Sequence, residues 1–392
     1  MNATKFASVV FAGGLALAAS AARAEDTPPA AAAPAGPTAL TAPAMSATLS
    51  ANADPISSDV SFFGKIYFSG QATALGFAQD NPVPGDHKNK VDVSNLQFEI
   101  QKTDGLVQFY VQAGGYSLPS LGTPYFEAKH VPDLTYKWVP VAYLKLQPTP
   151  EWSVLIGKLP TLIGAEYTFT FENFNIDRGL LWNQETAISR GVQVNYAKGP
   201  LTVSASWNDG FYSKKFDTAS GLISYALNPK DTVAFVASGS FKKVNVSSFV
   251  TPIAQNNGTI WNLIWTHTDG PWVVVPYLQY TTTPKYPAAG LASSASTFGG
   301  AVLAKYSFSP MFNLAGRVEY IGSSGSQVSL LYGPKSNAFS ATITPTWQFK
   351  TFFIRGELSY TKLDKIAPGA GFGSAGLQTG QTRGMIESGF LF

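Results

Sequence analysis

One segment, residues 159–187, gathers charged and aromatic side chains more densely than the rest of the chain (LPTLIGAEYTFTFENFNIDRGLLWNQETA). Its charged residues are Glu166, Glu172, Asp177, Arg178 and Glu185. Acidic and basic groups that face each other across a wet passage create a transverse field, which orders water and favours small polar or ionic solutes. So many aromatic rings would be poorly solvated on an outer surface. We therefore expect the segment to fold inward and narrow an interior; a surface lobe packed on its own rings is the alternative.

Groups that could perform catalysis are sparse. The chain has three histidines, His87, His130 and His267, and their spacing suggests no metal site. His267 lies near Asp269 and hydroxyl residues, which makes it a weak hydrolase candidate beside a short turn. The glycine-rich stretch 369–376 lacks a phosphate-binding pattern. We predict no enzyme activity, no catalytic residue, no metal and no cofactor.

The elements that must position the charged segment are β-strands. From residue 57 onward, apolar and polar residues alternate with period 2, as in 96–101 (LQFEIQ) and 201–208 (LTVSASWN). One face of each such strand meets an apolar medium and the other a polar one. Sixteen strands are predicted, beginning near 63, 91, 105, 139, 151, 188, 200, 220, 231, 258, 271, 297, 311, 338, 351 and 381.

The connections between these strands alternate strictly in length. Seven are short and punctuated by glycine, proline or polar residues, as at 103–105 (TDG) and 269–271 (DGP), while the others are long. A transmembrane up-and-down antiparallel β-barrel sorts its connections in this way, with short periplasmic turns and long outer loops. We predict an all-β fold of this kind with about 16 strands, 14 to 18 being possible.

Composition agrees with a membrane barrel. Of the 392 residues 45% are hydrophobic and 13% charged, and beyond the N-terminal segment there is no apolar run long enough for a transmembrane helix. Residues 1–24 resemble a signal peptide, with Lys5 at its start and a cleavage site after Ala24. Without Lys5 and Arg23 the net charge falls from +3 to +1, so we expect no nucleic-acid partner.

The predicted domain organisation has three parts. The signal peptide, 1–24, is followed by an Ala/Pro-rich flexible periplasmic leader, 25–56, and by the barrel, 57–392. A partner-binding proline-rich motif is the alternative for the leader.

The alternation of polar and apolar residues places seven basic and four acidic side chains on the lumen wall, a small cationic bias. They are Lys65, Lys145, Lys242, Lys305, Arg317, Arg355 and Arg383, with Glu99, Glu319, Glu357 and Glu387.

Aromatic residues cluster at strand ends beside turns, which suggests an interfacial girdle. The ten residues are Trp152, Trp207, Trp272, Tyr306, Phe308, Phe312, Trp347, Phe349, Phe352 and Phe353.

Two stretches resemble known proteins. Residues 154–208, with 156–158 (IGK), 177–181 (DRGLL) and 190–192 (RGV), look like the outer-membrane β-barrel porins called OmpL-like. The resemblance implies a Gram-negative outer-membrane pore, without defining its solute. The last strand, 381–392, resembles the terminal strand of bacterial outer-membrane proteins, which implies that Phe390 and Phe392 form an assembly signal for the barrel-assembly machinery.

The resulting functional hypothesis is an outer-membrane pore for passive diffusion of small hydrophilic solutes or ions, weakly selective and mildly anion-preferring. A substrate-specific transporter and a non-conducting structural or adhesive barrel are the alternatives. If the wall charges pair with one another, they merely keep the lumen wet. Expected partners are outer-membrane lipids, the assembly machinery and two further copies of the chain in a homotrimer.

Overall fold

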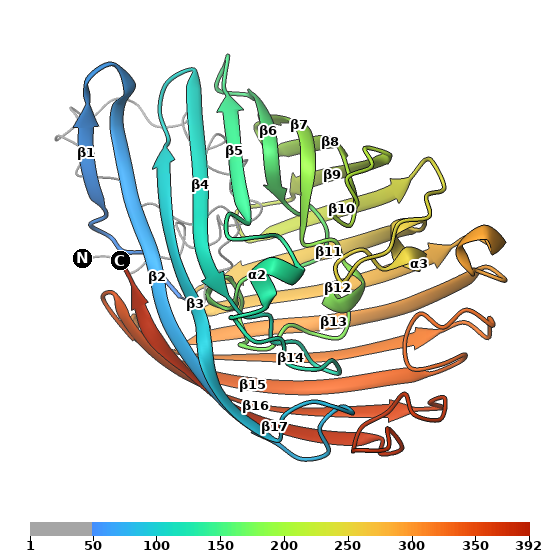
Figure 1. Cartoon of the computed structure of the whole chain (residues 1–392). Coiled ribbons are helices and arrows are strands. Elements are labelled where there is room, and N and C mark those ends of the chain that lie inside the picture. Colours follow the sequence, from blue (N-terminus) through green and yellow to red (C-terminus); the bar gives the residue numbers. More distant parts are fainter. Residues whose placement is uncertain (1–48) are drawn as a thin grey trace.

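The computed structural model describes residues 49–392, which form one closed antiparallel barrel (Figure 1). Sixteen strands, β2 to β17, pair in chain order, and β17 closes the barrel on β2 from Arg383↔Gln79 to Leu391↔Gln71. This confirms the predicted fold, and every strand begins within two residues of its predicted start. The strands are β2 (Gly64–Gln79), β3 (Asn89–Lys102), β4 (Val107–Tyr116), β5 (Val141–Leu146), β6 (Trp152–Pro160), β7 (Ile188–Lys198), β8 (Leu201–Asn208), β9 (Thr218–Ala226), β10 (Asp231–Ser240), β11 (Thr259–Asp269), β12 (Trp272–Thr283), β13 (Ala295–Ser307), β14 (Phe312–Ser323), β15 (Asn337–Phe349), β16 (Phe352–Asp364) and β17 (Gly380–Leu391).

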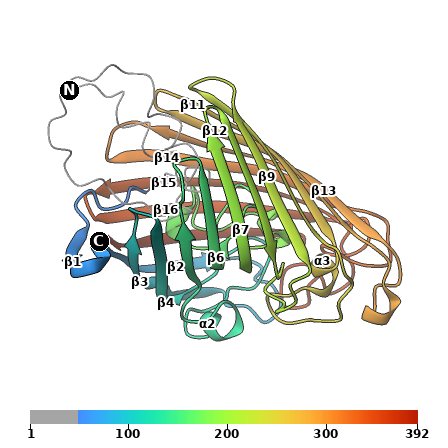
Figure 2. The same cartoon turned by 90° about the horizontal axis from the view of Figure 1, so that it is seen from above.

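Short turns and long connections alternate between the two ends of the barrel, as predicted. Gly105, Gly199 and Gly270 take left-handed φ values in the short turns, a conformation that glycine adopts without steric cost. The longest connection, 161–187, contains the short helices η4 (Thr170–Glu172) and η5 (Trp182–Gln184). The connection 117–140 carries α2 (Val131–Leu134), and α3 (Ile253–Asn256) precedes β11. Both helices lie at the end of the barrel opposite β1 (Ile56–Val60) (Figure 2).

The side chains exposed on the outside of the barrel are mostly apolar and those buried inside it are mostly polar, the reverse of a water-soluble protein. On β3 the outward Leu96 and Phe98 are 52% and 60% exposed, whereas the inward Gln97 and Glu99 are buried. An exposed apolar band with a polar inner face is stable only when the band lies in lipid. No helix among residues 49–392 is both long enough and apolar enough to cross a membrane.

Two members of the predicted girdle lie elsewhere. Phe353 points inward and is fully buried, because it falls on the inward phase of β16. Trp207 lies near the long-loop end of β8, where its ring packs against Phe216.

The N-terminal side of the barrel differs from the expected leader. Residues 1–48 lie outside the described part of the chain, so the signal peptide and most of the leader stay predictions. Within the leader's last residues, Leu49 is fully buried, and the amide of Gln348 hydrogen-bonds both the N–H and the C=O of Ser50 at 2.8 Å. The strand β1 then pairs with Gly64–Phe68 and projects with that part of β2 at one end of the barrel (Figure 1). The last residues of the predicted leader are therefore attached to the barrel at Leu49 and Ser50 and again at Ile56, which pairs with Phe68.

Candidate pore constriction

The connection 161–187, here called the internal loop, lies inside the barrel. It leaves the wall at Pro160 and returns at Ile188, which are register partners on β6 and β7. Between these points it crosses the lumen and reaches the opposite wall, where three buried arginines, Arg317, Arg355 and Arg383, hold it. Each arginine contacts a wall or loop carboxylate and a main-chain carbonyl of a lumenal connection.

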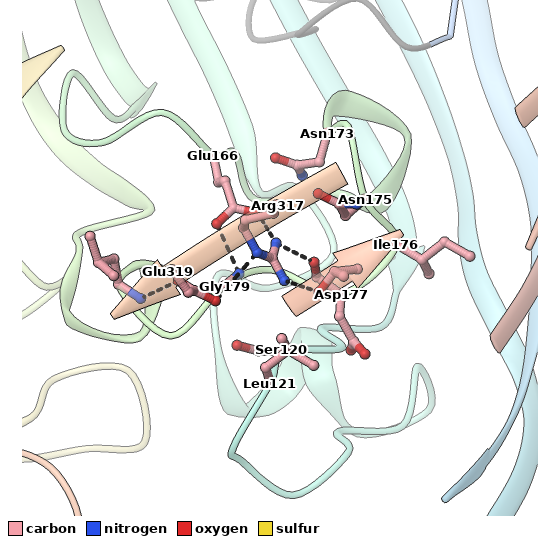
Figure 3. A network of polar contacts seen from close by, with 12 residues as sticks. Ser120, Leu121, Glu166, Asn173, Asn175, Ile176, Asp177, Gly179, Arg317 and Glu319 are labelled. Atoms are coloured by element: carbon pink, nitrogen blue, oxygen red, sulfur yellow. Dashed lines mark hydrogen bonds and ion pairs between the residues drawn. The ribbon is translucent and has the colours of Figure 1, made fainter. Parts of the chain in front are cut away.

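Arg317 on β14 makes the central attachment (Figure 3). Its Nη1 donates to Glu166 Oε1 at 2.5 Å and to the Asp177 carbonyl at 2.8 Å. Its Nε lies 3.3 Å from Glu319 on the same strand, and Glu319 in turn accepts the N–H of Leu181. One guanidinium therefore neutralises two buried carboxylates and fixes both arms of the internal loop.

Arg355 and Glu387 form the second attachment. Arg355 Nη2 lies 2.6 Å from Glu387 Oε2, and it also donates to the Thr170 carbonyl at 2.7 Å. Glu387 accepts the Thr170 hydroxyl at 2.6 Å, so η4 is held by both members of the ion pair. Asn95 on β3 donates to the same hydroxyl, also at 2.6 Å.

Asp177 is the centre of the third attachment. Arg383 Nη1 contacts Asp177 Oδ1 at 2.9 Å. The Glu357 carboxylate accepts the main-chain N–H of Asp177 at 3.0 Å and the main-chain N–H of Ile176 at 2.5 Å. Main-chain N–H groups thus satisfy the wall carboxylate of Glu357, which has no arginine within salt-bridge distance among residues 49–392. Burying such a charge without hydrogen bonds would cost several kcal/mol, about 1–3 for each unsatisfied group and more when it is charged.

The other face of the internal loop is apolar and packs on a different part of the wall. Ile163, Phe174, Leu180 and Leu181 belong to one buried cluster with inward residues of the wall. Those wall residues include Val236, Ile260, Ile264, Tyr277 and Leu303. Gln279 on β12 adds a hydrogen bond to the Leu181 carbonyl at 3.0 Å. The loop is thus held by ionic contacts on one side and by burial of apolar surface on the other.

Gly179 is required by the crowding of carboxylates. A Cβ at this position would lie 2.5 Å from Glu319 Oε2 and 2.7 Å from Glu166 Oε2. The glycine instead presents its N–H to Glu166 at 2.8 Å. In the sequence 177–181 (DRGLL), Asp177 therefore pairs with the wall, Arg178 is buried, and Gly179 lets the main chain lie close to the two carboxylates.

Some charged groups of the internal loop have no hydrogen-bond partner among the described residues. All three guanidinium nitrogens of Arg178 are buried without a hydrogen-bond partner in this part of the chain, although the group lies 5.1 Å from the Trp182 ring.

Burial raises the pKa of the Glu172 carboxyl to about 8, against its usual 4.5. The N–H of Phe169 opposes this rise, and the nearby charge of Glu99 adds to it. Burial also raises the pKa of Glu185 well above its usual value, with the charges of Glu166 and Glu319 adding to the effect.

Most of the predicted wall residues face the lumen, but two do not. Lys65 lies on the part of β2 that pairs with β1, beyond the segment where β17 closes the barrel, and it faces Asp59 across that pair. Lys242 is exposed in the connection after β10, because that strand ends at Ser240. Lys145 is partly buried, and Lys305 and Glu99 are buried on the inward phase. Glu99 accepts hydrogen bonds from Ser69 and Gln71.

These positions change the predicted charge balance. With Lys65 and Lys242 removed, the named wall residues comprise five basic and four acidic side chains, and the five charged residues of the loop bring the totals to six basic and eight acidic. The three wall arginines are each within salt-bridge distance of a carboxylate. The predicted cationic excess of the wall is therefore smaller, one charge in place of three, and the wall arginines hold the loop in place.

Sequence reasoning did not identify the neutral groups that fasten the loop. Asn95, Gln279 and Thr344 bond it from three strands, and Thr344 receives the Asn175 amide at 2.7 Å. Such residues are common on any polar barrel face, so no local pattern marks them. The acidic partner of His267 is not Asp269, as predicted, but Asp231 on the neighbouring strand β10, which His267 Nδ1 contacts at 2.7 Å. Among residues 49–392, no three His, Asp or Glu side chains gather as a metal site.

The closed barrel, its apolar outer band and its internal loop define the chain as an outer-membrane porin-type β-barrel. Residues 65–392 match the model of the OmpL-like beta-barrel porin-2 family, and the chain belongs to that family. No curated protein matches the sequence.

Solved structures show the same fold at low sequence identity. OmpT, an outer membrane protein of Vibrio cholerae, is 13% identical, with a TM-score of 0.57 over 87% of this chain and 100% of that one. The anion-selective porin from Comamonas acidovorans is 10% identical, with a TM-score of 0.55 over 83% and 98%. OmpF from Salmonella typhi, solved with daunomycin, is 12% identical, with a TM-score of 0.54 over 86% and 100%.

The Glu172 carboxyl provides a pH-dependence prediction. Because its pKa in the folded protein, about 8, exceeds the usual 4.5, protonation stabilises the packed loop. This contribution is complete below pH 4.5 and is lost as pH rises through 8. We expect the thermal midpoint of the purified barrel to fall between about pH 4.5 and 8, and to fall less in Glu172→Gln.

Glu127→Gln is the matched control for this measurement. Hydrogen bonds from Lys90 and Lys129 lower the pKa of Glu127 to about 2, so it stays ionised throughout that range. Equal pH slopes for the wild type and Glu172→Gln would contradict the prediction.

Proposed function

We propose that the protein is a narrow outer-membrane pore for passive diffusion of small hydrophilic solutes and ions, with weak charge selectivity. The observation that carries this proposal is the unequal attachment of the internal loop. It is hydrogen-bonded to the wall from β11 round to β17 and to β3. Within the described part of the chain, it makes no side-chain hydrogen bond to β8, β9 or β10.

Small hydroxyl side chains lie on the inward faces of those three strands, beside the apolar Leu222, Ala234 and Val236 that pack against the loop. They are Ser204, Ser206, Ser224 and Ser238. A small polar lining offers water and solutes hydrogen bonds without fixed charge. We place the passage between these side chains and the loop; they are only 4–8% exposed, so little water reaches them and the passage is narrow. A hollow bordered by Thr218, Ser238 and Thr281 lies toward the long-loop end of the same strands and suits its entrance.

Weak selectivity follows from the charge arrangement. Ion-paired arginines present little net charge to a passing solute, and the serine face presents none. We further propose outer-membrane insertion after removal of residues 1–24, recognition of Phe390 and Phe392 by the assembly machinery, and assembly as a homotrimer. The exposed outward ring of Phe390 and the pairing of Phe392 with Gly70 support a terminal strand that is presented at the barrel seam.

Replacing Ser206 by tryptophan tests the position of the passage. The ring would occupy the space between β8 and the internal loop, so single-channel conductance in planar bilayers is expected to fall by about half or more. Ala205→Trp is the control, because Ala205 is the adjacent residue on the same strand and points outward into the lipid-facing band. Equal conductance of the two variants and the wild type would place the passage elsewhere.

A further inference from the structure

A cationic cluster lies on the outer face of the barrel near its long-loop end. Lys158 on β6 and Arg190 on β7 are register partners, and both fall on the outward phase of their strands. Tyr212, from the connection after β8, places its ring 3.8 Å from the Arg190 guanidinium and 5.8 Å from Lys158 Nζ. The exposed Lys137 and Lys214 lie within electrostatic reach of the same ring.

The geometry of the cluster is fixed by the surrounding structure. Arg190 is ion-paired at 2.6 Å with the buried Asp209, which also accepts the N–H of Lys214. Lys158 Nζ donates to the carbonyls of Tyr136 and Val139 at 3.2 and 2.6 Å, and the Tyr136 ring packs edge-on against Tyr212. Asp209 balances one of the four cations, so three positive charges remain at one surface site.

The backbone at this site is strained. Among residues 49–392, eight non-glycine residues have positive φ, and Lys137, Tyr212 and Lys214 are three of them, at 69°, 58° and 64°. Left-handed φ values at non-glycine residues carry an energetic cost and gather at functional sites. Here the strained residues bring two lysines and an aromatic ring to the Lys158–Arg190 pair.

The position relative to the apolar band indicates the source of a ligand. Leu144, Ile156, Val192 and Trp207 form an outward, exposed apolar row in register across four strands. Lys158 and Arg190 come two residues further toward the long loops on the same strands. A cation directly beyond an exposed apolar row lies at headgroup level, where it can meet an anionic headgroup whose acyl chains cover the row.

From this juxtaposition we propose that the cluster of Lys137, Lys158, Arg190 and Lys214 binds the phosphate of a phosphorylated glycolipid in the external leaflet of the outer membrane. The guanidinium and ammonium groups contact the phosphate, Trp138, which is half exposed nearby, covers the sugar, and the Leu144 to Trp207 row contacts the acyl chains. This site lies on the outer face of the barrel, so it acts independently of solute passage through the lumen.

The test is a titration of the full-length purified protein in detergent with diphosphoryl lipid A, followed by native mass spectrometry. Lys137→Gln together with Lys214→Gln is expected to weaken binding about 25-fold, because each cation near an anionic surface contributes about fivefold. Both side chains are exposed, and the Arg190–Asp209 pair is retained. Lys158→Gln, a separate variant, is expected to weaken binding about fivefold.

Lys362→Gln is the matched control, since Lys362 is an exposed, outward lysine near the long-loop end of β16. Unchanged binding in Lys362→Gln, and weak binding of phosphatidylcholine to all proteins, would support the proposal. Equal lipid A affinity of the wild type and the double variant would overturn it. Full competition by millimolar inorganic phosphate would also overturn it, because the site would then take free phosphate in place of a lipid.

Discussion

Replacement of Arg317 by methionine is expected to lower the free energy of unfolding by about 3–5 kcal/mol, the usual effect of removing one partner of a buried ion pair. Arg317 neutralises Glu166 and Glu319 and also donates to the Asp177 carbonyl. All of these partners are buried, so water cannot replace the guanidinium without opening the loop. Denaturant unfolding in detergent micelles measures the loss.

Two further variants separate the charge from the packing. Arg317→Lys keeps the positive charge but loses the planar fork, and is expected to fall between the wild type and Arg317→Met. Changing Glu166 and Glu319 to glutamine in the Arg317→Met background removes the uncompensated carboxylates, and is expected to recover part of the lost stability. A loss below about 1 kcal/mol in Arg317→Met would show that the ion cluster does not hold the loop.

Removal of the internal loop is expected to have the largest effect on permeation. Since Pro160 and Ile188 are register partners, a short turn can join β6 to β7 in place of residues 163–185. The ion pairs of Arg355 with Glu387 and Arg317 with Glu319 lie within the wall and remain. We expect the single-channel conductance to rise about threefold or more, because the deleted segment fills the middle of the lumen.

A second truncation controls for the general effect of shortening a loop. Residues 285–292 belong to the connection between β12 and β13, whose ends Thr283 and Ala295 are also register partners. Their removal leaves the internal loop attached and is expected to leave the conductance unchanged. If both truncations changed the conductance equally, the internal loop would not be the constriction.

The barrel could be predicted because its determinants are local. Alternation such as that of 96–101 depends on the two media that a strand separates, and each short turn carries the residues that its backbone needs. These signals placed all sixteen strands and the closing pair β17–β2. The same alternation placed Arg317, Arg355 and Arg383 on the inward phase.

Other features depend on contacts between distant segments. Arg317 and Glu166 are 151 residues apart, and nothing in either local sequence identifies the other as its partner. Lys65 and Lys242 were wrongly placed because the alternation was extended past the point where the barrel wall ends. Leu49 was missed because a single apolar residue in an Ala/Pro-rich leader gives no pattern, yet it is fully buried against the barrel.

A planar-bilayer recording of the wild-type protein tests the central claim, that a narrow aqueous passage runs beside the internal loop. We expect discrete openings with a linear current–voltage relation, a conductance below that of the loop-deleted variant, and a reversal potential close to zero in a salt gradient. Silence of the wild type, with openings appearing only after loop deletion, would show that the loop seals the barrel and would contradict the assignment as a pore.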